Sequence, residues 1–258
     1  MDMTDPALAV PIAATSLRKV YKGTVAVDGI DFTVAPGSVV GLLGGNGAGK
    51  TTTIAMIMGL VVPTSGSVRV FGADMARDRY RVLHRLNFES PYVDMPHRLT
   101  VRQNLKVFAR LYGVADIGAR IAALAETLML QDFLDRPAGQ LSAGQKTRVA
   151  LAKAMINDAE LLLLDEPTAS LDPDTADWVR SRLEEFRARC NSTILLASHN
   201  MREVERLCDR VIMMKAGRIV DDDTPDGLLA RYGRSDLEEV FLDVSRGRRE
   251  AAAAGGAA

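Results

Sequence analysis

The chain has 258 residues, which is enough for one large domain or two small ones with a substantial core. Its 32 basic and 33 acidic residues give a formal net charge of −1, so no overall field favours nucleic acid or an anionic membrane surface. The two cysteines, Cys190 and Cys208, make no metal or disulfide framework and are expected to be reduced, packed thiols. The acidic N-terminal sequence and the lack of a long apolar run predict a soluble, cytosolic chain without signal peptide or membrane helix.

The first part of the chain has the pattern of short strands with one helix among them. The dipeptides Lys22–Gly23 and Asp28–Gly29 predict turns between the first β-branched runs. The run 39–43 is apolar without alternation, which is typical of a strand buried on both faces. The predicted strands are residues 17–21, 25–27, 30–34, 39–43 and 68–71, and the predicted helix is 49–60.

The pattern changes to helices between about residues 100 and 156, where Thr100 can cap the first of them. Farther on, strands and helices alternate, which predicts a parallel sheet with crossover helices. We therefore expect an α/β core with an inserted helical block at about 90–158. The residues 1–14 and the Ala/Gly-rich 246–258 are expected to be tails. The later predicted strands are 161–164, 193–197 and 211–214, and the later helices are 173–189 and 201–208.

A glycine-rich segment, Gly44–Thr51, fits the pattern G-x-x-x-x-G-K-[ST] between a predicted strand and a predicted helix. Glycines let backbone N–H groups converge on phosphate oxygens at a helix N-terminus. Lys50 would place its charge toward the β- and γ-phosphates, and the Thr51 hydroxyl can bind Mg²⁺. A glycine-rich turn with a chance lysine would match in roughly one chain in a hundred of this size. The predicted ATP-binding residues are Gly44, Gly45, Asn46, Gly47, Ala48, Gly49, Lys50, Thr51 and Thr52.

A second motif, Leu161–Pro167, delivers Asp165 and Glu166 at the carboxyl end of an apolar strand, where ligands bind in open α/β sheets. Asp165 would hold Mg²⁺ through water, and Glu166 would activate the attacking water. Two solvated acids at a strand end are the alternative. The phosphate-binding pattern in the same chain favours the catalytic interpretation.

A third motif, Leu141–Gln145, precedes an amphipathic helix predicted at 146–156. Ser142 is a natural N-cap, and the amides that follow it make a second anion-binding segment. One phosphate cradle is enough for an enzyme of this kind, so a second one about 90 residues downstream of the first is the most informative feature of the sequence.

Together these three motifs resemble the nucleotide-binding subunit of ATP-binding-cassette (ABC) transporters, in the family's order from about residue 17 to 242. The resemblance implies a P-loop NTPase core of α/β class with a mixed, largely parallel sheet. It also implies an antiparallel β subdomain at the N-terminus and an inserted α-helical subdomain, all within one domain of residues 15–245.

The resemblance further assigns roles to single residues. Tyr21 is similar to the aromatic residue that stacks on adenine, although a core tyrosine is an alternative for this position. His199 matches the histidine that senses the γ-phosphate and, with Glu166 and Lys50, completes the expected catalytic set. The segment 170–172 resembles the loop that couples the two sites of a dimer.

In the family, two subunits pack head to tail, and the third motif of one closes over ATP held by the phosphate loop of the other. The expected partner is therefore a second copy of this chain or a paired cassette. The residues expected to act across such a dimer are Ser142, Ala143, Gly144, Gln145 and Asp172.

The sequence departs from the family pattern at three positions. The family usually has Pro at Gly45 and Gly at Ala143, which are mild changes. Where it has a Gln that contacts Mg²⁺ and water, the best alignment places Ser90. Glu89 or Ser90 can still contact the metal through water, but neither is expected to take over the full role of the glutamine. The expected metal-binding residues are therefore Thr51, Asp165 and Ser90.

Three further sets of residues are expected to have no part in the site. Gln103 lies in the following helix and is not expected to replace the missing glutamine. His84 and His97 are expected to be exposed or structural. The run Asp221–Asp223 is expected to be a solvated turn rather than a metal site.

One cassette without a membrane span predicts an energising subunit, held at the cytoplasmic face of the membrane by separate permease subunits. In the family, the permease subunits dock on the segment that corresponds to 89–101. The segment 236–242 resembles the short C-terminal helix of exporter-type subunits. The alternative is a soluble ABC ATPase acting on DNA or the ribosome. Such members carry two cassettes or a long coiled coil, and the neutral charge argues against nucleic acid. A third option, an ATP-binding regulator without turnover, conflicts with the presence of Glu166.

Overall fold

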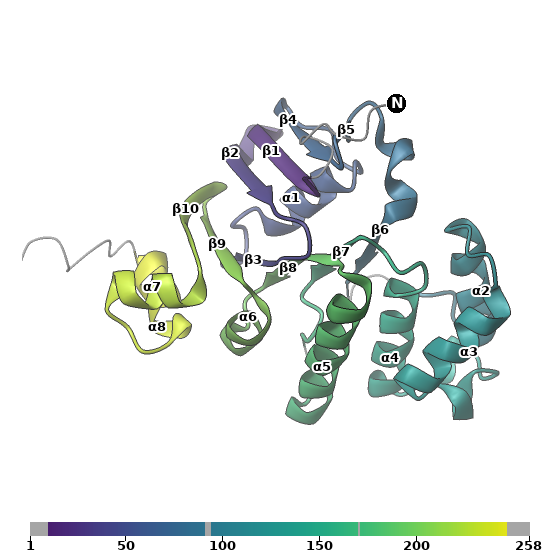
Figure 1. Cartoon of the computed structure of the whole chain (residues 1–258). Helices are drawn as coiled ribbons and strands as arrows, with labels where there is room; N and C mark the ends of the chain where they lie inside the picture. Colours follow the sequence, from purple (N-terminus) through teal and green to yellow (C-terminus); the bar gives the residue numbers. More distant parts are fainter. Residues whose placement is uncertain (1–9, 91–93, 170, 247–258) are drawn as a thin grey trace, which may run out of the picture. The chain divides into compact units, whose positions relative to one another are not determined.

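The computed structural model describes residues 10–90, 94–169 and 171–246. These residues form two compact units, drawn in Figure 1. The first unit consists of residues 10–79 and 193–246, and the second of residues 80–192. The predicted tails lie largely outside the described residues, and the domain boundaries predicted from the sequence stay a prediction.

An antiparallel sheet begins the first unit. Its strands are β1 (Ile12–Tyr21), β2 (Thr24–Val34), β4 (Ser65–Val70) and β5 (Ala73–Asp74), in the order β2-β1-β4-β5. The predicted turn at Lys22–Gly23 is confirmed, because both residues have positive φ, as a two-residue hairpin turn requires.

The turn predicted at Asp28–Gly29 is wrong, since β2 runs through both residues. The Asp28 amide donates to Gly217 O at 2.8 Å, and its carboxylate pairs with Arg18 and Arg218. The Arg18 and Arg218 guanidinium groups hold the pKa of the Asp28 carboxyl below its usual value. Gly29, at φ 66°, and irregular pairing with β1 absorb the local distortion without ending the strand.

The other strands of the first unit are β3 (Val39–Leu43), β8 (Thr193–Ser198), β9 (Arg210–Lys215) and β10 (Arg218–Asp223), in the order β10-β9-β3-β8. β3 pairs in parallel with both β8 and β9 and is buried along its whole length, as predicted. The helices of this unit are α1 (Lys50–Ile57), α6 (Met201–Leu207), α7 (Pro225–Tyr232) and α8 (Leu237–Arg246).

The acidic run Asp221–Asp223 belongs to β10, so the prediction of a turn is wrong. Arg231 of α7 pairs with Asp221 and Asp223, and Arg210 of β9 pairs with Asp222 through two hydrogen bonds. Two arginines thus offset two of the three negative charges and tie α7 to the strand, which favours an extended run.

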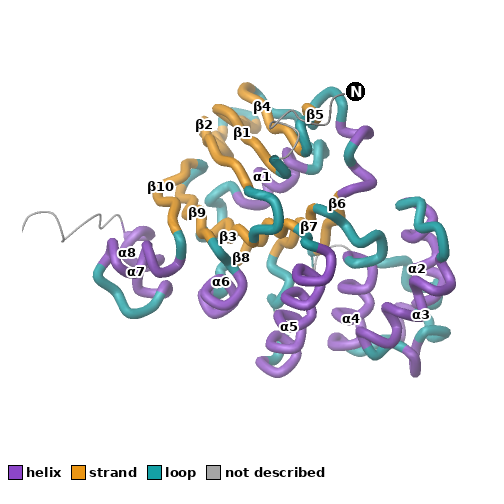
Figure 2. The backbone as a smooth tube through the Cα atoms, viewed as in Figure 1, coloured by secondary structure: helices purple, strands orange, loops and turns teal. Residues whose placement is uncertain are grey.

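The second unit is mainly helical, as Figure 2 shows. Its parallel strands β6 (Leu86–Glu89) and β7 (Leu161–Asp165) pair with each other. Its helices are α2 (Val101–Leu111), α3 (Ile117–Leu128), α4 (Ala143–Ala154) and α5 (Pro173–Cys190). Short 3₁₀ turns are η2 (Arg79–Arg81), which begins at the last residue of the first unit, η3 (Leu83–Arg85), η4 (Gln131–Phe133) and η5 (Ala138–Gln140).

A capping box begins the helical part of this unit, where Thr100 was predicted as a cap. The Thr100 hydroxyl accepts the Gln103 amide at 3.1 Å, and the Gln103 side chain accepts the Thr100 amide at 2.9 Å. Gln103 therefore has a structural role in α2. In the described parts of the chain, no helix has both the length and the apolar character needed to cross a membrane.

Two glycines with similar backbone angles test how tightly the first sheet is packed. Gly66 has φ 74°, and a Cβ there would lie 2.1 Å from Ser16 O, whereas Gly113 has φ 69° with nothing within 4 Å. We expect Gly66→Ala to lower the free energy of unfolding by about 3 kcal/mol or more, and Gly113→Ala by only about 1–2 kcal/mol. Urea unfolding of both variants measures the difference, and equal losses would contradict the packing described for β4.

Candidate nucleotide-binding site

The phosphate loop lies between β3, which ends at Leu43, and α1, which begins at Lys50. Gly47 and Gly49 have φ of 76° and 108°, in the left-handed region that favours glycine. A Cβ at Gly49 would lie 2.6 Å from Ala26 O, so a side chain has no space there. Glycine is therefore required at position 47 by backbone angle alone and at position 49 by both backbone angle and packing.

The loop is fastened to the β9–β10 hairpin. The Gly217 amide donates to Ala48 O at 3.1 Å, and a Cβ on Gly44 would lie 2.6 Å from Met214 O. At the start of α1, both the amide and the hydroxyl of Thr53 donate to Gly49 O at 2.9 Å. The loop is thus held at both ends before any ligand binds.

Lys50 is buried, and its ammonium lies inside the loop. Its Nζ donates to Gly44 O at 2.5 Å and lies 3.5 Å from Gly45 O. A positive charge is therefore concentrated where the loop amides and the N-terminus of α1 already favour an anion. Thr51 follows it and is an exposed residue.

A cavity of about 280 Å³ lies between the loop and strand β2. Strand β2 contributes residues that sequence reasoning missed, because only the hairpin register brings them to the loop. Tyr21 pairs with Thr24 across that hairpin. The residue is 43% exposed, and Lys19 Nζ lies 5.0 Å from the centroid of its ring. Tyr21 therefore stands beside the cavity wall and is not a core residue. The lining residues are Thr24, Val25, Ala26, Gly45, Gly47, Ala48, Gly49, Lys50, Thr51 and Thr52.

A second cavity, of about 340 Å³, borders the loop residues Gly45–Ala48 together with β9 and α8. Lys215 Nζ donates to Val244 O and Ser245 O at 3.0 and 2.9 Å, so the end of α8 is fastened beside the loop. The sequence did not predict this contribution of α8. It depends on Lys215, which lies 29 residues before Val244 and 30 residues before Ser245.

His199 lies at the same edge of the sheet as the phosphate loop. β3 and β8 run parallel with Leu43 opposite Ser198, so Gly44 and His199 leave the two strands side by side. His199 is exposed. The structure thus brings this predicted residue close to the loop within the first unit.

The second unit carries the acidic residues. Glu89 pairs with Leu164 in the parallel β6–β7 ladder, so the next residues, Ser90 and Asp165, lie at the same edge. Both are buried. Glu166 has φ 58°, in the left-handed region that costs a residue with a side chain about 1–3 kcal/mol. The backbone at this predicted residue is thus strained.

Glu89 forms a buried ion pair with Lys153 of α4, with Oε2 and Nζ 2.6 Å apart and both side chains only 6% exposed. Burial raises the pKa of the Glu89 carboxyl, and the Lys153 ammonium opposes this rise. The carboxylate of Glu89 is therefore engaged by α4.

Helix α4 begins at Ala143, three residues earlier than predicted, because Ser142 forms a capping box. Its hydroxyl accepts the Gln145 amide at 3.3 Å, and the Gln145 side chain accepts the Ser142 amide at 3.1 Å. Ser142 and Ala143 are exposed, and the amides of Ala143 and Gly144 occupy first-turn positions that have no acceptor within a helix. The predicted anion-binding end is thus preformed and accessible.

Asp172 is the N-cap of α5, and its carboxylate accepts the Thr175 amide at 2.9 Å. This hydrogen bond lowers the pKa of the Asp172 carboxyl from its ordinary value. Ser170, in the same predicted coupling segment, lies outside the described residues. Arg148 of α4 stacks on Trp178 of α5, 4.8 Å from the ring centroid, so the two helices that carry Ser142 and Asp172 contact each other.

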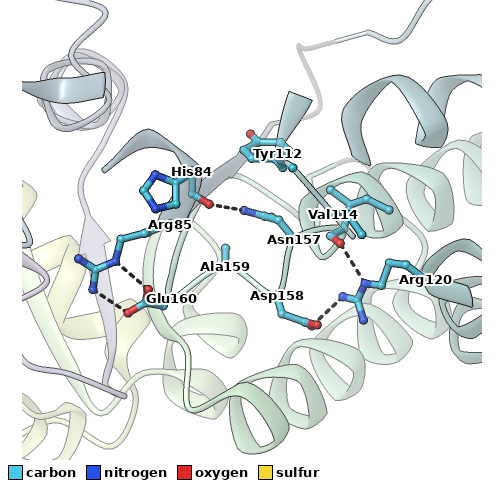
Figure 3. Close-up of a pocket in the computed structure, with 11 residues that line it drawn as sticks. His84, Arg85, Tyr112, Val114, Arg120, Asn157, Asp158, Ala159 and Glu160 are labelled. Atoms are coloured by element: carbon cyan, nitrogen blue, oxygen red, sulfur yellow. Dashed lines mark hydrogen bonds and ion pairs between the residues drawn. The ribbon is translucent and has the colours of Figure 1, made fainter. Parts of the chain in front are cut away.

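A pocket of about 500 Å³ in the second unit contains none of the predicted site residues (Figure 3). Its charges are already paired, Arg85 with Glu160 and Arg120 with Asp158. The pocket therefore has no excess of positive charge and does not fit a triphosphate. His84 lies in its wall and, like His97, is exposed, as predicted.

Comparison with known proteins places these motifs in a family. The model of the family described as ABC transporter matches residues 27–169. Nod factor export ATP-binding protein I of Paraburkholderia xenovorans is 38% identical over 227 residues, which cover 87% of this chain and 74% of that protein. A solved ATP-binding subunit of an ABC transporter has a TM-score of 0.83 at 26% identity, covering 91% of this chain and 99% of its own. The cbiO1 protein of Clostridium perfringens, part of the ABC transporter complex cbiONQ, has a TM-score of 0.76 at 27% identity, covering 93% and 98%.

Because the ammonium of Lys50 lies inside the loop, its contribution to binding the phosphates of ATP can be tested directly. We expect Lys50→Ala to weaken ATP binding by about 100-fold or more, as for the loss of a charge-assisted hydrogen bond of nearly 3 kcal/mol. Isothermal titration with ATP measures this, with Lys106→Ala, an exposed lysine of α2, as the control. Unchanged affinity in Lys50→Ala would mean that this loop does not hold the phosphates.

Proposed function

Since the chain belongs to the ATP-binding subunits of ABC transporters, a family of ATPases, we propose that it powers export through a separate membrane permease. The observation that carries this proposal is the presence in one chain of two helix N-termini of the kind that favours anions, at Lys50 and at Ser142. The name of the relatives, Nod factor export ATP-binding protein I, supports export as the direction. It also favours transport over a soluble ATPase acting on DNA or the ribosome.

In the first unit, the phosphate loop holds the triphosphate, and Tyr21 stacks on the adenine. Lys50 neutralises the β- and γ-phosphates, and His199 contacts the γ-phosphate. The position of His199 beside Gly44 and the exposed ring of Tyr21 beside Thr24 support these roles.

The residues also suit Mg²⁺, which prefers oxygen ligands and keeps several of its waters. Thr51, an exposed residue, has a hydroxyl, and Asp165 has a carboxylate at a strand end in a buried position. Thr51 would bind the ion directly, while Asp165, with Ser90 beside it, would hold it through water. The ion would neutralise charge on the transferred phosphoryl group.

Glu166 is the general base that takes a proton from the attacking water. In Glu166→Gln we expect ATP affinity to stay unchanged while hydrolysis slows by about two to four decades, because the amide cannot accept that proton. The variant is also expected to accumulate as an ATP-bound dimer. Phosphate release and size-exclusion chromatography with ATP measure both effects.

The control is Glu238→Gln, an exposed glutamate of α8, which should hydrolyse ATP like the parent. Parent-like turnover in Glu166→Gln would remove this residue from the role of base.

The second anion-binding end acts across a dimer. Ser142, Ala143, Gly144 and Gln145 of one subunit close over the ATP bound by the other, and Asp172 lies in the segment that couples the two sites. The exposure of Ser142 and Ala143 and the contact between α4 and α5 support this arrangement.

Mixing two inactive variants tests whether the sites are shared. Ser142→Arg disables the N-terminus of α4, and Lys50→Ala disables the phosphate loop. In a mixed dimer, one of the two shared sites therefore combines an intact loop with an intact N-terminus of α4. At equal amounts and random pairing, about a quarter of the parent's activity should return. ATPase activity of the mixture against each variant alone measures this. If crosslinking shows that mixed dimers form and no activity returns, the shared site is wrong.

The permease would dock on the segment 89–101 and hold the chain at the cytoplasmic face of the membrane. Residues 91–93 of this segment lie outside the described residues. The similarity to cbiO1, a part of the complex cbiONQ, supports assembly with further subunits.

A further inference from the structure

Strand β6 turns two polar side chains to the same side. Asn87 and Glu89 are two residues apart, and side chains alternate along a strand, so both lie on one face. Both are buried, and both contact the same residue of α4. Asn87 Nδ2 donates to Lys153 O at 3.0 Å, and Glu89 Oε2 lies 2.6 Å from Lys153 Nζ. Lys153 is thus held by its backbone and by its side chain.

The contacts of Asn87 extend to neighbouring elements. Its Oδ1 accepts the Tyr112 hydroxyl at 3.1 Å at the end of α2, and its Nδ2 donates to Asn157 Oδ1 at 3.0 Å after α4. Tyr112 and Asn157 are drawn in Figure 3. The Lys153 ammonium also lies 5.7 Å from the centroid of the Phe108 ring on α2. The network therefore joins β6, α2 and the end of α4.

A buried ion pair tolerates little separation of its partners. Breaking it leaves an uncompensated charge away from water, which costs more than the net value of the pair. Strand β6 and helix α4 are therefore expected to move as one body. Ser142 lies eleven residues before Lys153, or about 16 Å along a helix with a rise of 1.5 Å per residue. The network fixes one end of α4, and the anion-binding end is the other.

We propose that the Glu89–Lys153 pair is a positioning element for ATP hydrolysis, on the basis of the function proposed above. It holds α4 on β6, so that the capped end at Ser142 keeps a set position relative to Ser90 and Asp165 at the ends of β6 and β7. Glu89 and Lys153 pair with each other, and they act through the elements that they hold.

The test uses Glu89→Gln, Lys153→Met, the double variant and the conservative Lys153→Arg in the full-length protein. The control is Arg85→Gln, which breaks the exposed Arg85–Glu160 pair at 2.7 Å in the same unit. For each variant, kcat and KM of ATP hydrolysis, ATP affinity and thermal midpoint are measured.

We expect kcat to fall by about tenfold to a hundredfold in both single variants, as for a catalytic group that is slightly misplaced. The ATP affinity of both should stay within about twofold of the parent, because the phosphate loop is intact. Lys153→Arg should restore most of kcat, and Arg85→Gln should match the parent.

The double variant decides the question, because it contains no uncompensated charge and is expected to regain the parent's thermal midpoint. Under the proposal its kcat stays low. A parent-like kcat in the double variant, or its failure to fold, would show that the pair serves stability alone and would overturn the proposal. Absence of ATPase activity in the parent would instead count against the function proposed above.

Discussion

The rest of the site depends on one backbone constraint, which is the tight path of the loop Gly44–Gly49. That geometry requires left-handed angles at Gly47 and Gly49, and it leaves no space for side chains beside Ala26 and Met214. The buried strand β3 starts the loop, the β9–β10 hairpin clamps it, and α1 presents its N-terminus to it. An anion site made of backbone needs such support, because amides alone do not hold a fixed direction.

The two units prepare their functional groups in different ways. The first relies on backbone: glycine angles, parallel pairing and a lysine bound to loop carbonyls. The second relies on side chains: a capping box at Ser142, a buried ion pair at Lys153 and a strained backbone at Glu166. The phosphate loop is thus shaped by local backbone geometry, whereas the position of α4 depends on side chains of other elements.

Local patterns predicted most elements of the fold and misplaced others, for identifiable reasons. The run 39–43 and the cap at Thr100 were predictable because strand burial and helix capping depend on neighbouring residues. Asp28–Gly29 and Asp221–Asp223 resemble turns in sequence, but arginines from distant positions pair with the aspartates and keep both segments extended. In both cases the extended conformation goes with ion pairs to arginines of other secondary-structure elements.

The sequence by itself determined the motifs of the candidate site, because phosphate binding, capping and a strand-end carboxylate each need fixed residue types at fixed spacing. It also determined the family, since three such motifs in one order are highly specific. Only the tertiary structure decided that Thr24–Ala26 line the cavity, that α8 is fastened beside the loop and that Glu89 is engaged by Lys153. These contacts join residues far apart in the chain, and no local pattern encodes which distant side chain a buried charge will meet.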